Sequence, residues 1–262
     1  MAWRLALAAL LALAGPVAHA TPEDPFPRIA AAYLVLVDGE PLWAHAPDAR
    51  RAPASLAKLM SALVVVEQGA LDEAVTIGAE AARARGSRLG LHAGERVPAH
   101  GLLAAMLVGS ANDACYALAE RRGRVSDFVA RMNARAAELG LRATRFGDPC
   151  GFDRDRQYST ARDLARLAQA FMQRAQLAAL VGQLRVEVAT EGRERVFTVK
   201  NTNVLVEFFP GTIGVKTGNT RRAGDNLIAL AERGGRRALL VLLGARDRWW
   251  DADAILARAL AR

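Results

Sequence analysis

Ser55 and Lys58 have the residue types and the spacing for covalent catalysis. They lie in a stretch that begins with Pro53 and continues in good helix formers, so we expect a helix from near Ser55 to near Gly69. Three residues apart, the two side chains would share one face of its first turn. Free N–H groups and the helix dipole would stabilise a developing alkoxide there. Ser55 is therefore a candidate nucleophile.

Lys58 is the candidate base. Only three of the 35 basic residues are lysines, namely Lys58, Lys200 and Lys216. A lysine buried among Leu, Met and Val has a lowered pKa and can accept the hydroxyl proton, whereas an arginine stays protonated. On its own, Ser-x-x-Lys equally fits a helix-capping serine followed by a surface lysine. The catalytic interpretation therefore depends on motifs elsewhere in the chain.

A second motif, Ser110-Ala111-Asn112, follows the apolar helical pattern of residues 99–108. Its hydroxyl and carboxamide lie two residues apart on a turn, so both can face one cavity. Alone, it would be read as a cap for the next helix.

A third motif, Lys216-Thr217-Gly218, lies in a strand-like run. Period-two alternation predicts that Lys216 and Gly218 share one face and that Thr217 points the other way unless the edge twists. Gly218 would let a ligand backbone approach closely.

The order Ser-x-x-Lys, Ser-x-Asn, Lys-Thr-Gly is typical of β-lactamases and penicillin-binding proteins. With these motifs the sequence resembles the serine-type D-alanyl-D-alanine carboxypeptidases, the low-molecular-mass penicillin-binding proteins of peptidase family S11. Residues 110–114, 157–164, 214–220, 223–224 and 248–252 are also similar to that family's signatures. One departure is Asp148-Pro149-Cys150-Gly151, where the family usually has an Asn-Pro-x-Gly loop.

The resemblance implies a role for each motif residue in cleaving the terminal peptide bond of a D-alanyl-D-alanine stem. The catalytic set is Ser55 (nucleophile, acyl-ester), Lys58 (general base), Ser110 (proton relay), Asn112 (substrate amide) and Lys216 (electrostatic and carboxylate contacts). The substrate-binding set is Thr217, Gly218, Asn219 and Arg248, with the Asn219 and Ser55 N–H groups as the oxyanion hole. Muropeptides would be the substrates, β-lactams covalent inhibitors, and no metal or organic cofactor would be needed.

The pattern of elements predicts an α/β (α+β) fold. Strands are expected at both ends of the chain, at about 31–37, 42–44, 196–199, 211–220, 226–231 and 237–243. Helices are expected between them and at the end, at about 99–108, 113–121, 126–139, 159–180 and 251–261. The resemblance implies a DD-peptidase/β-lactamase-like fold, an antiparallel sheet flanked by N- and C-terminal helices plus an all-helical lobe. We expect one domain over residues 21–262, with a sheet lobe at about 21–70 and 190–262, a helical lobe at about 71–189, and the site in the cleft between them.

Residues 1–20 read as a signal peptide, with Arg4, an apolar run over 5–14 and Ala18-His19-Ala20 as the cleavage site; an uncleaved anchor is the alternative. We expect a periplasmic or extracellular protein, with no C-terminal β-domain and no stable membrane anchor. The net charge of +8 suits an anionic wall surface, but the arginines are scattered without interleaved aromatics, which argues against nucleic-acid binding.

Cys115 and Cys150 are the only cysteines. In an oxidising compartment they either form a disulfide or remain two buried small hydrophobic residues. Neither has metal-like spacing to a histidine, so zinc is not expected.

Three other functions remain open from the sequence. A DD-endopeptidase would use the same groups on cross-links. A class A β-lactamase needs a deacylating glutamate, whereas the stretch between Glu138 and Glu187 offers aspartates such as Asp148, Asp153 and Asp155. A catalytically dead wall-binding module is the third, and the three intact motifs argue against it.

Overall fold

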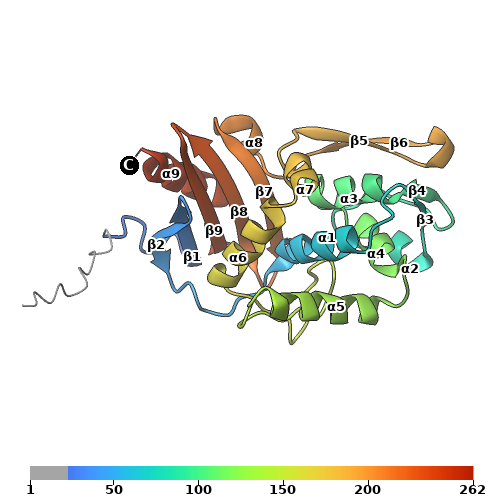
Figure 1. The fold of residues 1–262 in the computed structure, drawn as a ribbon, viewed down its shortest axis with the longest axis horizontal. Coiled ribbons are helices and arrows are strands. Elements are labelled where there is room, and N and C mark those ends of the chain that lie inside the picture. Colours follow the sequence, from blue (N-terminus) through green and yellow to red (C-terminus); the bar gives the residue numbers. More distant parts are fainter. Residues whose placement is uncertain (1–22, 262) are drawn as a thin grey trace, which may run out of the picture.

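The computed structural model describes residues 23–261 and places a five-stranded antiparallel sheet beside a group of helices (Figure 1). The strand order is β2-β1-β9-β8-β7. The strands are β1 (Ala30–Val37), β2 (Glu40–His45), β7 (Thr212–Thr220), β8 (Gly224–Arg233) and β9 (Arg236–Ala245). β1 pairs with β9, so strands from the two ends of the chain complete one sheet, and the predicted fold class is confirmed.

Alternating side chains give the sheet two apolar faces. In β1, Leu34 and Leu36 join the core shared with the helices, whereas Tyr33 and Val35 join a smaller core on the opposite face. α9 (Arg248–Leu260) packs on the smaller core. Both faces are thus covered, which explains why these strands read as nearly continuous hydrophobic runs.

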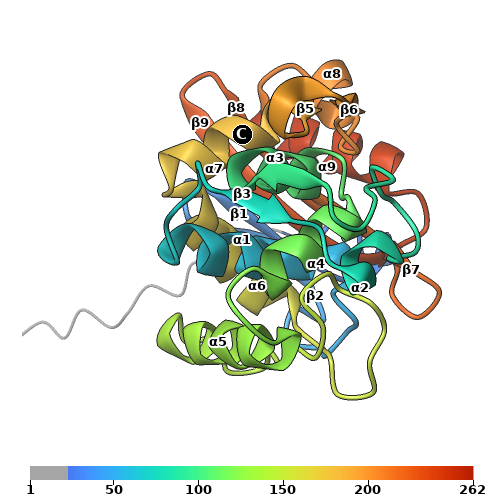
Figure 2. The same ribbon diagram turned by 90° about the vertical axis from the view of Figure 1, so that its right-hand side faces the viewer.

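α1 (Lys58–Glu67) runs through the middle of the helical part and contacts four other helices, α3, α4, α5 and α6. Eight of its ten residues are buried, as expected for a helix that is apolar on all sides. The surrounding helices are α2 (Ala79–Ala82), α3 (Ala99–Val108), α4 (Asn112–Glu120), α5 (Val125–Glu138), α6 (Ala161–Met172) and α7 (Ala175–Val181). Figure 2 shows α5 on the outside of this group.

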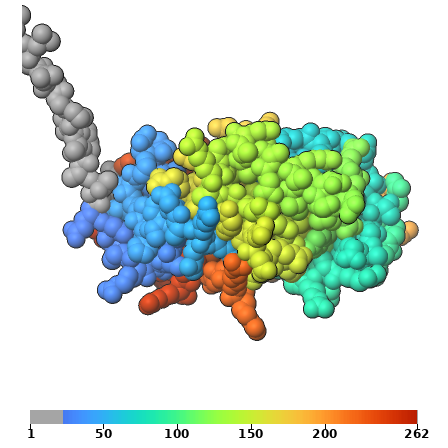
Figure 3. Space-filling model, turned by 90° about the horizontal axis from the view of Figure 1, so that it is seen from below, coloured from blue at the N-terminus to red at the C-terminus, as the bar shows by residue number. Residues whose placement is uncertain are grey.

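The remaining elements are short. They are the 3₁₀ turns η1 (Ala54–Ala57) and η2 (Glu191–Arg193), the strands β3 (Ala74–Thr76), β4 (Arg96–Pro98), β5 (Arg185–Ala189) and β6 (Val196–Lys200), and α8 (Leu205–Phe208). The molecule is elongated, with the blue β1–β2 hairpin toward one end and the teal residues of the helical part at the other (Figure 3).

Several predicted boundaries differ from the structure. The expected helix near Ser55 begins as the 3₁₀ turn η1, and α1 starts only at Lys58. The helix expected over 159–180 is interrupted at Arg174, whose extended backbone separates α6 from α7. The last helix begins at Arg248, three residues early, because Asp247 caps it through the N–H groups of Trp249 and Trp250.

The expected signal segment lies outside the described residues. Among residues 23–261, no helix is both long enough and apolar enough to cross a membrane.

Candidate active site

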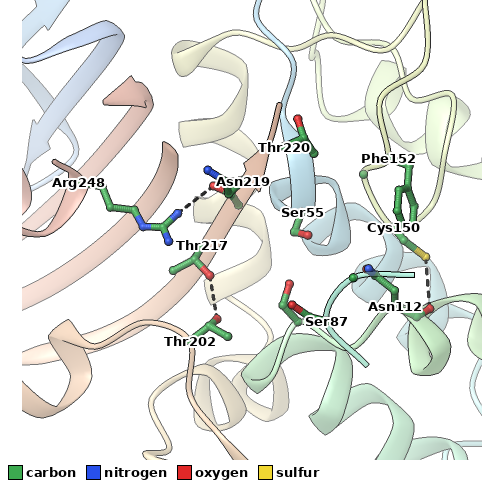
Figure 4. A pocket seen from close by; sticks show the side chains of 14 residues that line it. Ser55, Ser87, Asn112, Cys150, Phe152, Thr202, Thr217, Asn219, Thr220 and Arg248 are labelled. Carbon is green, nitrogen blue, oxygen red and sulfur yellow. Dashed lines mark hydrogen bonds between the residues drawn. The ribbon is translucent and has the colours of Figure 1, made fainter. Parts of the chain in front are cut away.

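A cavity of about 310 Å³ lies where β7, η1 and the start of α4 meet (Figure 4). Seven of the predicted residues line it, namely Ser55, Ser110, Asn112, Thr217, Gly218, Asn219 and Arg248. Six further lining residues were not predicted as site residues: Gly86, Ser87, Gly151, Phe152 and Thr202 come from loops, and Thr220 is the last residue of β7. Cys150 also lines the cavity, whereas Lys58 and Lys216 lie fully buried behind its wall.

η1 presents Ser55 to the cavity. The residue before it, Ala54, is buried with a φ of +49°, a conformation that a residue with a Cβ rarely adopts. Gly218 of β7 packs directly against this turn, since a Cβ at Gly218 would lie 3.1 Å from the Ser55 nitrogen. β7 is the edge strand of the sheet, so part of its backbone faces η1 rather than a neighbouring strand. The Ser55 N–H and the backbone around Asn219 are therefore close to each other.

Lys58 is the centre of the site's hydrogen bonding. Its Nζ lies 2.9 Å from Ser55 Oγ, 2.8 Å from Asn112 Oδ1 and 2.7 Å from the Cys150 carbonyl oxygen. The side chain is 0% exposed. Burial lowers the pKa of Lys58 to about 7, although the Asp148 carboxylate acts in the opposite direction.

These partners determine how a neutral Lys58 is oriented. The Asn112 and Cys150 oxygens can only accept hydrogen bonds, so they take the two N–H groups of a neutral amine. Of the three partners, only the Ser55 hydroxyl carries a proton to donate. The amine lone pair is therefore directed at the Ser55 hydroxyl, the arrangement that a general base requires.

Asn112 and Ser110 lie on the opposite wall from β7. Asn112 Nδ2 donates to the Arg85 carbonyl at 2.6 Å, which leaves its Oδ1 facing Lys58. Ser110 has a φ of +59°, and at 7% exposure it lines the cavity directly before α4. Both polar side chains of the second motif thus reach the cavity.

On β7, the strict alternation expected for the third motif does not describe the cavity wall. Thr217, Gly218, Asn219 and Thr220 all line it, whereas Lys216 is buried beside Lys58. The pairing of β7 with β8 is regular from Gly214 to Thr220, but β7 lies at an edge of the sheet, so residues from both of its faces can line a cavity at that open edge. Thr217 Oγ1 lies 2.7 Å from Thr202 Oγ1, from the loop before α8.

Arg248 is the cationic side chain that lines the cavity, and Lys216 lies buried behind its wall. Lys216 Nζ donates to the Thr217 carbonyl at 3.1 Å, and burial, with smaller contributions from Lys58 and Arg248, lowers the pKa of Lys216 well below its ordinary value. Arg248 donates to the Gly218 carbonyl at 3.0 Å and pairs with Asp225 at 3.1 Å. No residue that lines the cavity in the described chain carries a carboxylate. The cavity is therefore suited to an anionic ligand group.

Cys115 and Cys150 form a disulfide with a Cα–Cα distance of 5.8 Å, the first of the two alternatives left by the sequence. It joins α4 to the loop that supplies a carbonyl to Lys58.

A serine and a buried lysine in a cleft between an antiparallel sheet and a helical lobe define a class of serine acyl-transfer enzymes. Residues 18–247 match the D-alanyl-D-alanine carboxypeptidase family, peptidase family S11. The chain belongs to this family, as its motifs indicated.

Several curated proteins are similar to most of this chain. The D-alanyl-D-alanine carboxypeptidase DacF of Bacillus subtilis is 35% identical over 79% of the chain, which spans 54% of that protein. DacA of Escherichia coli K12 is 34% identical over 84% of the chain, which spans 57% of it. The Streptomyces K15 enzyme is 32% identical over 83% of the chain, with 82% of the relative covered. The crystal structure of the Streptomyces K15 DD-transpeptidase superimposes with a TM-score of 0.83 at 32% identity, covering 89% of this chain and 98% of that one.

Proposed function

We propose that this protein is a serine-type D-alanyl-D-alanine carboxypeptidase that trims peptidoglycan stem peptides through an acyl-enzyme. The observation that carries the proposal is the Ser55 hydroxyl 2.9 Å from a buried Lys58 with a pKa lowered to about 7. The names of the relatives and the Ser-x-x-Lys, Ser-x-Asn, Lys-Thr-Gly order support it.

In the first step, neutral Lys58 takes the proton of Ser55 as Oγ attacks the carbonyl between the last two D-alanines. The tetrahedral oxyanion accepts hydrogen bonds from the N–H groups of Ser55 and Asn219. Ser110 donates its proton to the leaving amine and takes the proton held by Lys58, so D-alanine departs as a neutral amine, Ser55 remains an ester and Lys58 is neutral again. Water then attacks the ester while Lys58 takes its proton, and that proton returns to Ser55 Oγ as the acid is released.

The two ends of the cavity suggest the direction of the bound peptide. Arg248 and Thr217 lie on one side of Ser55, and Phe152 lies on the other (Figure 4). The terminal carboxylate fits the first side, where Thr217 and Arg248 supply hydrogen-bond donors and Arg248 supplies positive charge. A bound carboxylate would also favour the charged form of Lys216, which is buried behind them. A second cavity of about 750 Å³ shares Phe152 and Thr220 with the first, which leaves room for the preceding residues of the stem.

The carboxypeptidase activity is tested with a monomeric pentapeptide stem and a cross-linked dimer, digested side by side. We expect D-alanine release from the pentapeptide, and Ser55→Ala should abolish it. Faster cleavage of the dimer would assign the protein as a DD-endopeptidase instead, and no cleavage of either would reject the proposal.

Rapid turnover of penicillin is not expected. Asp148 is buried outside the cavity wall, and Asp153 accepts a hydrogen bond from Thr220 at 2.8 Å. Neither carboxylate is free beside the ester to activate water as a deacylating glutamate would. A penicilloyl adduct should therefore persist, and hydrolysis at a β-lactamase-like rate would contradict this.

Export is part of the proposal, because peptidoglycan lies outside the cytoplasm. The signal-like residues 1–20 and the Cys115–Cys150 disulfide support it. Mass analysis of the protein from a cell envelope fraction should find Thr21 as the first residue; an intact Met1 would contradict cleavage.

A further inference from the structure

The turn from Asp148 to Phe152 is held by one buried carboxylate. Asp148 is 2% exposed. Its Oδ1 accepts hydrogen bonds from three backbone N–H groups, those of Cys150, Gly151 and Phe152, at 2.9, 3.0 and 3.2 Å. Its Oδ2 accepts from the Tyr116 hydroxyl at 2.7 Å and from Arg154 at 3.2 Å. Five hydrogen-bond donors to this one carboxylate hold the turn in place.

The turn contacts the catalytic pair directly. The Cys150 carbonyl accepts a hydrogen bond from Lys58 Nζ at 2.7 Å. Ser61 of α1 donates to the Pro149 carbonyl, which attaches the turn to the helix that carries Lys58. Gly151 lies so close to η1 that a Cβ there would be 2.0 Å from the Ala54 carbonyl oxygen. A shift of the turn would therefore alter the hydrogen bonding of Lys58 and displace the backbone next to Ser55.

Asp148 also brings negative charge behind Lys58. Its own cationic partner, Arg154, has a side chain that is 57% exposed, so water screens much of that positive charge. A second buried carboxylate, Asp113 of α4, accepts from the N–H groups of Leu89, Gly90 and Leu91. Burial lowers the pKa of Lys58 and the Asp148 carboxylate raises it, while Lys58 in turn lowers the pKa of its buried neighbour on β7, Lys216.

We propose that Asp148 is a positioning residue for the general base: its carboxylate builds the turn that directs the Cys150 carbonyl at Lys58, and its charge sets the pH range in which Lys58 accepts a proton. This inference rests on the proposed role of Lys58 as the base. The nearby carboxylate stabilises the ammonium form of Lys58. The acid limb of the pH–rate profile, where the rate falls as Lys58 is protonated, therefore lies at a higher pH than burial alone would give.

The test is Asp148→Asn, measured through the pH dependence of Ser55 acylation by a penicillin. Asparagine keeps the Oδ1 acceptor for the three N–H groups, and the Tyr116 hydroxyl can turn to accept from the new amide. Because the negative charge is lost, the acid limb should move to lower pH by on the order of one unit. A purely structural role would lower the melting temperature without moving the limb.

Two further variants separate charge from hydrogen bonding. Tyr116→Phe removes a neutral donor from the same carboxylate, so it should lower stability and leave the acid limb in place. Arg154→Gln removes the positive charge that partly offsets Asp148, so the limb should move slightly upward. The upward shift should be the smaller one because Arg154 is largely solvated.

An acid limb that is unmoved or raised in folded Asp148→Asn would overturn the inference. If that variant does not fold, Arg154→Gln decides, and an unmoved or lowered limb there overturns it. Absence of acylation in the wild-type protein would instead reject the proposed function, so the two failures are distinguishable.

Discussion

At the scale of single residues, a lysine occupies position 58 in a chain whose basic residues are almost all arginines. Its three contacts to Ser55, Asn112 and Cys150 need a small amine that can lose a proton. A guanidinium is too large for this pocket and stays protonated.

Lys58→Arg should therefore be nearly as damaging as Lys58→Ala, with the rate of Ser55 acylation reduced by on the order of 10³-fold or more. Lys200→Arg is the matched control because Lys200 is exposed on β6, and it should retain the wild-type rate. Stopped-flow measurement of penicillin binding checks both. An arginine variant that kept most of its activity would show that a neutral lysine is not the base.

The pKa of Lys58, lowered to about 7, fixes the pH dependence. The neutral amine is the active form, so kcat/KM should be lost as the pH falls through about 7 and be retained above it. Below the limb the rate should fall about tenfold per pH unit. A pH profile with a D-alanyl-D-alanine peptide checks this; a limb near pH 4 would indicate a carboxylate base instead.

The residues that carry the chemistry could be predicted from the sequence because each motif is local. Ser55 and Lys58 are three residues apart, and Ser110 and Asn112 are two apart. Lys58 contacts the Cys150 carbonyl across a sequence separation of 92 residues. The acceptor is a backbone oxygen, which every residue has, so no sequence pattern indicates this contact. Around Asp148, three of the five donors lie within four residues of it, but the Tyr116 hydroxyl comes from 32 residues away, and no local pattern indicates that contact.

At the scale of elements, the prediction was most accurate where burial and periodicity agree. α3 spans Ala99–Val108, the predicted range, because it is apolar throughout and a proline precedes it. β5 was not predicted, although Val186 and Val188 alternate with the exposed Arg185 and Glu187 in the pattern of a half-buried strand; with only five residues the pattern is short. The start of α1 was displaced because packing against β7 holds Ser55 in a 3₁₀ turn, which intrinsic helix propensity does not reveal.

The contact between the Asp148 turn and η1 predicts a large effect of Gly151→Ala. Gly39 has the same φ of +92° but nothing within 4 Å of its missing Cβ, whereas a Cβ at Gly151 would clash with Ala54. Gly151→Ala should therefore cost about 1–3 kcal/mol more stability than Gly39→Ala. It should also slow Ser55 acylation, which Gly39→Ala should not. Urea unfolding measures the loss of stability, and penicillin labelling measures the acylation rate. An equal loss of stability in the two variants would show that the turn can move to accommodate the added methyl group.

At the scale of the whole molecule, the cleft is formed where segments distant in sequence meet. β7 follows the helical part, η1 precedes it, and α4 lies within it. The sheet could be anticipated because strand-like runs occur at both ends of the chain. The cleft residues from loops, such as Thr202 and Phe152, could not, since only the packing of the two parts brings them to the site.

The disulfide joins α4 to the loop that contains Cys150, across a sequence separation of 35 residues. Loop-closure entropy then predicts that Cys115→Ala/Cys150→Ala loses about 3–4 kcal/mol of unfolding free energy. Equilibrium urea unfolding checks this, with reduced wild-type protein as the comparison. An unchanged midpoint would mean that the disulfide does not constrain the unfolded chain.

The most direct test of the central claim is to label the folded protein with a penicillin and locate the adduct by peptide mass mapping. The account predicts one stable adduct on the peptide that contains Ser55, absent from Ser55→Ala and greatly slowed in Lys58→Arg. An adduct on any other residue, or none in correctly folded protein, would contradict it.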